Sequence, residues 1–157
     1  MKQLDLSKIK ARLENVSDEF NGLVAQIGFP SGQHYPDGTN VAYVAAIQEF
    51  GAPAVNIPPR PFMQPTVKAQ KDEWVKIIAN KLPQVAAGKM SAFDVLDSVG
   101  IKASADIQTT ISNIYSPPNS PATIERKGSS KPLIDTGLMY ASVRNSVAPE
   151  GSDFVVS

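Results

Sequence analysis

The tripeptide Asp135-Thr136-Gly137 is the pattern in this chain that most suggests catalytic chemistry. The same tripeptide carries the activating carboxylate of aspartic proteases, which need two such carboxylates sharing one proton. A second copy of the motif or a dimer partner would have to supply the other carboxylate. The protease motif also requires a tight loop between strands, whereas Leu138-Met139-Tyr140 favours a helical turn here. We therefore expect Asp135 or Thr136 to cap a short helix, with an aspartic-protease-like enzyme using Asp135 as the alternative.

No other group of residues has the spacing of a catalytic, cofactor or metal site. His34 is the only histidine, and the chain has no cysteine, so a zinc site has too few ligands. There is no Gly-rich phosphate loop and no nucleophile elbow. We expect His34 to lie in an exposed loop, and we expect no cofactor.

The proline-rich segment Ile57–Phe62 has the sequence Ile-Pro-Pro-Arg-Pro-Phe. Pro61 excludes the helical conformation at Arg60, and Pro59 does the same at Pro58. The segment should therefore be a stiff, extended strut.

Two functions of this strut are open from the sequence. Its end at Phe62 would fix the start of the helix that follows, where Pro65 is tolerated in the first turn. Alternatively, the strut presents Arg60 and its proline rings to a neighbouring subunit, because a stiff backbone loses little entropy on binding.

Hydrophobic spacing predicts the helices that hold these segments. Apolar residues three and four apart indicate amphipathic helices over residues 1–20, 63–82 and 91–114. The Ala-rich run 41–50 predicts a shorter helix, with Gly51 as its C-terminal cap. Ser91 and Asp94 form an N-terminal capping pair, Pro83 should end or kink its helix, and Gly100 with Ala103 should let another helix approach closely.

Alternating apolar residues predict strands at 23–29, 143–148 and 153–156. The fold class is therefore α+β, with a small antiparallel sheet packed against two or three long amphipathic helices and with extended Pro-rich loops. We expect one domain over residues 1–157, with mobile loops near 30–40 and 117–132.

Composition argues against several function classes. Fifteen Lys plus Arg balance fifteen Asp plus Glu, so no net positive field attracts nucleic acid or an anionic membrane. No apolar run approaches the roughly 20 residues that cross a bilayer, and the start of the chain lacks the features of a signal peptide. We expect a protein made and kept in a cytoplasm.

Four blocks in order resemble the neck or tail-completion family of tailed bacteriophages, also described as virion morphogenesis or minor tail proteins. These blocks are Ile47-Gln48-Glu49-Phe50-Gly51, Ile57-Pro58-Pro59-Arg60-Pro61-Phe62-Met63, Ser120-Pro121-Ala122-Thr123-Ile124, and Lys131-Pro132-Leu133-Ile134-Asp135-Thr136-Gly137 followed by Ser142-Val143. The match spans about residues 41–147. Pro59 replaces the small residue expected in the second block, which stiffens the strut.

The resemblance implies a non-enzymatic structural subunit of a virion, present in the host bacterial cytoplasm during assembly. It implies that the chain joins head to tail, or completes the upper end of the tail, as part of a ring. The partners would be other copies of the chain and the adjacent head–tail connector and tail proteins, with at most passive contact with DNA in the channel and no membrane involved. A prophage-encoded host-binding module is a further alternative.

Overall fold

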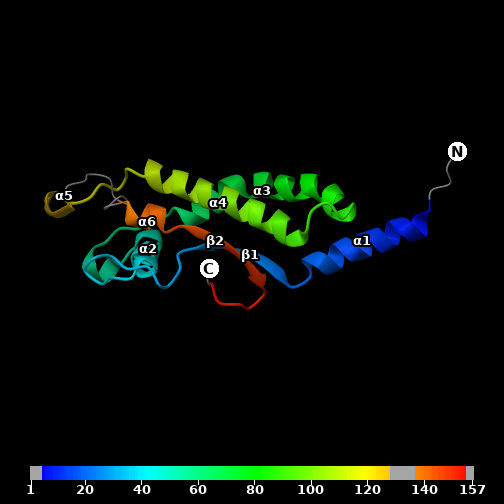
Figure 1. The fold of residues 1–157 in the computed structure, drawn as a ribbon. Helices are drawn as coiled ribbons and strands as arrows, with labels where there is room; N and C mark the ends of the chain where they lie inside the picture. Colours follow the sequence, from blue (N-terminus) through cyan, green and yellow to red (C-terminus); the bar gives the residue numbers. More distant parts are fainter. Residues whose placement is uncertain (1–4, 128–136, 155–157) are drawn as a thin grey trace.

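The computed structural model describes residues 5–127 and 137–154, and it confirms the α+β class with a small antiparallel sheet packed on helices (Figure 1). The elements in chain order are α1 (Leu6–Phe20), β1 (Leu23–Gly28), α2 (Val41–Phe50), the 3-10 turn η1 (Pro53–Val55), α3 (Met63–Ala86), α4 (Ala92–Asn113), α5 (Pro121–Lys127), α6 (Leu138–Ala141) and β2 (Arg144–Pro149).

The sheet has two antiparallel strands, β1 and β2, with Leu23 opposite Pro149 and Gly28 opposite Arg144. A third strand was predicted at 153–156. Asp153 and Phe154 form no strand, and the rest of that segment lies outside the described residues. Helix α4 packs against both strands, and α3 packs against α4. The long helices are therefore anchored to the sheet through α4.

Gly100 of α4 lies directly against β2. A Cβ atom at Gly100 would be 2.8 Å from Cβ of Asn145, and Asn145 Nδ2 donates a 2.8 Å hydrogen bond to Asp97 Oδ1. The prediction that another helix would approach Gly100 is therefore wrong at this position, because the close neighbour is a strand.

The main core lies where α2, the start of α3, the second half of α4 and α6 meet. Its buried members are Val41, Ala45, Phe62, Ile107, Ile111, Met139 and Val143. Phe29, just after β1, packs edge to face on Phe62 with ring centroids 5.8 Å apart. Phe62 thus connects the end of the proline-rich segment to both the helices and the sheet.

Two sequence-based predictions about the long helices have different outcomes. The capping pair at the start of α4 is confirmed, since the Asp94 amide donates to Ser91 Oγ and the Ser91 amide donates to Asp94 Oδ2, both at 3.1 Å. The hydrogen bonds from Ser91 lower the pKa of the Asp94 carboxyl. Pro83 does not end α3, which continues to Ala86.

The two regions predicted as loops contain more local structure than composition suggested. Within 30–40, His34 and Asn40 form an antiparallel bridge, and Asn40 Oδ1 caps α2 by accepting from the Tyr43 amide at 3.2 Å. Within 117–132, residues Pro121–Lys127 form α5, so that part of the loop prediction is wrong. Residues 128–132 lie outside the described part of the chain.

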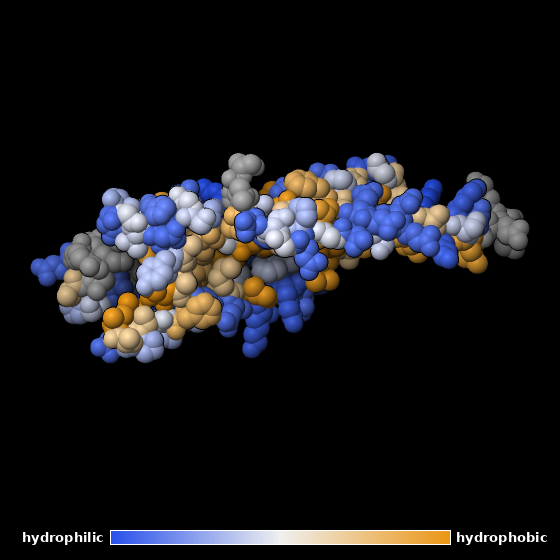
Figure 2. Space-filling view, turned by 90° about the horizontal axis from the view of Figure 1, so that it is seen from below, coloured by the Kyte–Doolittle hydropathy of each residue, from blue (hydrophilic) through white to orange (hydrophobic). Residues whose placement is uncertain are grey.

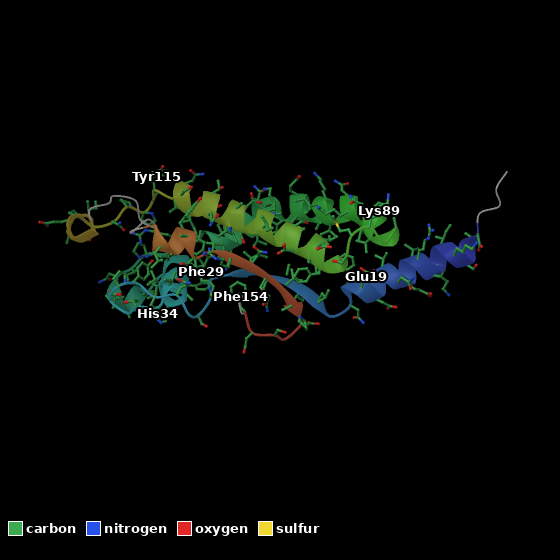
Figure 3. All side chains as sticks on the ribbon, viewed as in Figure 1. Glu19, Phe29, His34, Lys89, Tyr115 and Phe154 are labelled. Carbon is green, nitrogen blue, oxygen red and sulfur yellow. The ribbon has the colours of Figure 1, made fainter. Side chains whose placement is uncertain are left out.

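Helix α1 is amphipathic as predicted, but the rest of the molecule leaves the N-terminal part of its apolar face, at Leu6, Ile9 and Leu13, exposed. No residue of α1 is buried, and the helix projects from one end of an elongated body (Figure 1). Its attachment is at its C-terminal end, where Glu19 accepts a 3.2 Å hydrogen bond from the Ala92 amide at the start of α4 (Figure 3). Among the described residues, no helix is long and apolar enough to span a membrane.

We predict that Gly100→Val lowers the free energy of unfolding by about 1–3 kcal/mol, because its side chain overlaps Asn145. The matched control is Ala105→Val at an exposed position of the same helix, which should cost less than about 1 kcal/mol. Urea denaturation monitored by circular dichroism measures both changes. Equal costs for the two substitutions would contradict the close packing of α4 on β2.

Candidate functional site

The chain reverses direction immediately after α2, and Gly51 makes this reversal sterically feasible. Gly51 has φ of 75°, and its amide donates a 2.7 Å hydrogen bond to the Ile47 carbonyl as the C-terminal cap of α2. A Cβ atom at this position would lie 2.9 Å from both the Ile57 carbonyl oxygen and the Pro59 nitrogen. Glycine is therefore required both by the backbone conformation and by the close approach of the returning chain.

The proline-rich segment is not helical, as predicted, and it is bound to the end of α2 by hydrogen bonds. Ala52 and Ile57 exchange backbone hydrogen bonds of 2.9 and 3.1 Å across the 3-10 turn, and Asn56 takes the left-handed conformation. Beyond this turn, the Arg60 amide donates a 2.6 Å hydrogen bond to the Gln48 carbonyl. These hydrogen bonds thus hold the segment in a fixed position between α2 and α3.

Glu49 holds the start of α3 with a buried carboxylate. The side chain is only 6% exposed, and its Oε2 accepts from the amides of Phe62 at 2.7 Å and Met63 at 2.9 Å. Its Oε1 accepts from the Gln64 amide at 3.1 Å. The first amides of a helix have no partner within the helix, and the helix dipole favours a negative charge there. Phe62 supplies no side-chain cap, so Glu49 performs the capping function from a different helix.

Arg60 connects the proline-rich segment to the backbone that follows α4. Its guanidinium donates to the carbonyls of Pro117 at 2.7 Å and Pro118 at 3.1 Å, and to Oε1 of Gln48 at 3.1 Å. Burial lowers the pKa of the Arg60 guanidinium, which stays charged because an arginine is effectively always protonated in proteins. Only 6% of Arg60 is exposed.

These contacts distinguish the two functions considered for the strut. Phe62 is buried and lies at the start of α3, in agreement with the interpretation that the strut fixes this helix. Arg60 points inward, so the structure does not present it to a neighbour, whereas Pro58, Pro59 and Pro61 are exposed.

Phe50 and Ile57 were also singled out from the sequence, and the structure places them differently. Phe50 is 68% exposed, whereas Ile57 is partly buried beside Gly51. The residues that sequence reasoning missed are Pro117 and Pro118, whose carbonyls bind Arg60. Backbone acceptors leave no signal in residue type, so the sequence could not have identified them.

Of the tripeptide at 135–137, the structure describes only Gly137. Gly137 occupies the N-cap position of α6 with φ of 73°, and it makes no side-chain capping bond. The helical turn expected after the tripeptide is present. Asp135 and Thr136 lie outside the described residues, so both their capping role and the protease alternative stay predictions.

The described residues offer little for metal or proton-transfer chemistry. They contain no group of three or more His, Asp or Glu side chains placed to hold a metal ion. His34 is exposed, with Nδ1 3.2 Å from the Gly32 carbonyl oxygen (Figure 3). In the cluster itself, the carboxylate of Glu49 and the guanidinium of Arg60 are occupied by partners within the protein. The arrangement braces the backbone, and we call it the Glu49–Arg60 brace.

Comparison with protein-family models, with curated proteins and with solved structures gives no match to this chain. The resemblance to phage neck proteins therefore enters the functional argument as a proposal.

We predict that Glu49→Gln lowers the free energy of unfolding by about 1–3 kcal/mol, because an amide nitrogen then faces backbone donors and the negative charge at the helix start is lost. The matched control is Glu73→Gln, since Glu73 is exposed on α3, the helix that Glu49 caps, and forms only a surface ion pair with Lys76. Urea denaturation should show a lower midpoint for Glu49→Gln and an almost unchanged midpoint for Glu73→Gln. Similar midpoints would contradict the capping function of Glu49.

We predict that Arg60→Lys also destabilises the protein, by about 1–3 kcal/mol. A lysine ammonium cannot reproduce the planar fork that reaches two carbonyls and Gln48. Arg12→Lys on the exposed face of α1 provides the control and should change thermal stability little. If the Arg60→Lys variant kept full thermal stability, the guanidinium contacts would contribute little to the brace.

Proposed function

We propose that this chain is a non-enzymatic structural subunit of a tailed-phage virion, which assembles into a ring that joins head to tail or completes the upper end of the tail. One observation carries the proposal. Most residues of the first two blocks that resemble the neck family meet in the Glu49–Arg60 brace, where the printed contacts join Gln48, Glu49, Gly51, Arg60, Phe62 and Met63.

The brace supports an assembly function because it uses charged residues to fix shape. A buried carboxylate and a buried guanidinium are costly unless every partner is in place, so such groups favour one defined backbone arrangement. Here that arrangement holds a stiff proline segment with exposed rings between two helices. A subunit that must fit between neighbours benefits from a rigid segment of this kind, because little entropy is lost on docking.

The partners that follow from this proposal are other copies of the chain and the adjacent connector and tail proteins. Neutral net charge is compatible with passive contact with DNA in the channel. The protein would act in the virion after assembly in the host bacterial cytoplasm.

Electron microscopy and gene deletion test the proposal together. We predict that negatively stained protein forms rings, and that particles made without this gene separate into heads and tails. Restoring the gene in trans should restore joined particles. Intact, infectious particles formed in its absence would contradict the proposed function.

We further predict that Asp135→Asn joins heads to tails as efficiently as the unchanged protein, because the proposed function uses no catalytic carboxylate. The measurement is the yield of infectious particles in a complementation assay, with peptide cleavage by the purified protein as the second readout. Peptidase activity that disappears in Asp135→Asn would favour the aspartic-protease alternative.

A further inference from the structure

Helix α2 has an apolar face that points to solvent. Tyr43, Ala46 and Phe50 lie at positions i, i+3 and i+7, which places them on one side of the helix. Tyr43 is 63% exposed and Phe50 is 68% exposed. Val55, in the turn that follows, is 65% exposed. We call these four residues the α2 face.

The segment that carries the α2 face has no exposed charged side chain. Between Gly38 and Pro61 the only charged residues are Glu49 and Arg60, and both are buried in the brace. Seen from below, the end of the molecule that carries α2 shows gathered apolar side chains (Figure 2). Depletion of charge around exposed aromatic residues is characteristic of the centre of a protein–protein interface.

Helix α1 carries the second uncovered apolar face. Leu6, Ile9 and Leu13 are 70%, 41% and 64% exposed, and we call them the α1 face. The two faces lie toward opposite ends of the elongated molecule, so neither covers the other (Figure 1). A contact between them can therefore form only between two copies.

The two faces match in their spacing and in the sizes of their side chains. The helical residues of both faces follow the pattern i, i+3, i+7, and the middle one is the large Ile9 on α1 but the small Ala46 on α2. A large residue facing a small one lets two helices pack closely. We propose that the α1 face of one copy docks on the α2 face of the next copy.

This contact is heterologous, because each copy uses one face at each end. Repetition of a heterologous contact builds a ring when the rotation closes and a filament when it does not. The inference deepens the proposed function and rests on it for the ring, since it names the surfaces through which neighbouring subunits meet.

The expected size of the contact explains why association should depend on concentration. Burial of these few large side chains removes on the order of 800 Å² of surface, which falls in the class of weak interfaces. In a closed ring each copy makes two such contacts, and the final contact forms within one assembly at high effective concentration.

A mixing experiment with two double variants tests the proposal. Leu6→Glu with Leu13→Glu removes the α1 face, and Tyr43→Glu with Phe50→Glu removes the α2 face. Phe93→Glu with Ile101→Glu is the matched control, because these α4 residues are also about half exposed or more, at 50% and 57%. Circular dichroism confirms that each variant is folded before its mass is measured by sedimentation equilibrium.

We expect the unchanged protein and the α4 control to associate as concentration rises, and each face variant alone to stay monomeric. An equimolar mixture of the two face variants should form a one-to-one complex and nothing larger, since only one intact contact is possible. Association should weaken at least tenfold when either face is lost.

Three results would overturn the proposal: an unchanged protein that stays monomeric, a face variant that still self-associates, or a mixture that stays monomeric. Self-association of the α2-face variant would indicate pairing of two α1 helices. Self-association of the α1-face variant would indicate pairing of two α2 faces. Rings at the head–tail junction that survive both double substitutions would refute this contact and leave the proposed function standing. If the protein assembled through the two faces but was absent from virions, the contact would stand and the proposed function would be refuted.

Discussion

The buried carboxylate of Glu49 determines how the rest of this structure is arranged. Three successive amides at the start of α3 donate to it, and the N-cap residue Phe62 makes no side-chain capping bond of its own. The interaction fixes the end of α2 relative to the beginning of α3. Because Phe62 is the first of those donors and lies in the main core, the same interaction determines where the core forms.

The other elements follow from that anchor. Gly51 allows the chain to return along α2. Arg60 lies in this returning segment, and its guanidinium binds the carbonyls of the backbone that follows α4. Helix α3 then packs on α4, and α4 packs on the sheet, with Gly100 against β2. The two charged residues of this part of the chain, Glu49 and Arg60, are both buried in the brace, so the α2 face has no charged side chain. Stability and the proposed assembly surface thus depend on the same two side chains.

Local rules predicted the features that depend on neighbours in the sequence. The glycine cap of α2, the Ser91–Asp94 capping pair and the absence of helix in the proline-rich segment all follow from residues close in the chain. The partners of Glu49 and Arg60 do not, because they lie 12–15 or 57–58 residues away. The neighbour of Gly100 was misjudged for the same reason, since small residues on a helix permit close approach without specifying a helix or a strand. The exposure of α1 could not be foreseen either, because an amphipathic pattern does not identify what covers its apolar side.

Amide hydrogen exchange at Phe62, Met63 and Gln64 is the most direct test of this account. The first amides of a helix normally exchange quickly, because no carbonyl of the same helix accepts from them. The account predicts strong protection at all three positions in the unchanged protein, and loss of that protection in Glu49→Gln while the centre of α3 stays protected. Rapid exchange at these three amides in the unchanged protein would contradict the central role of Glu49.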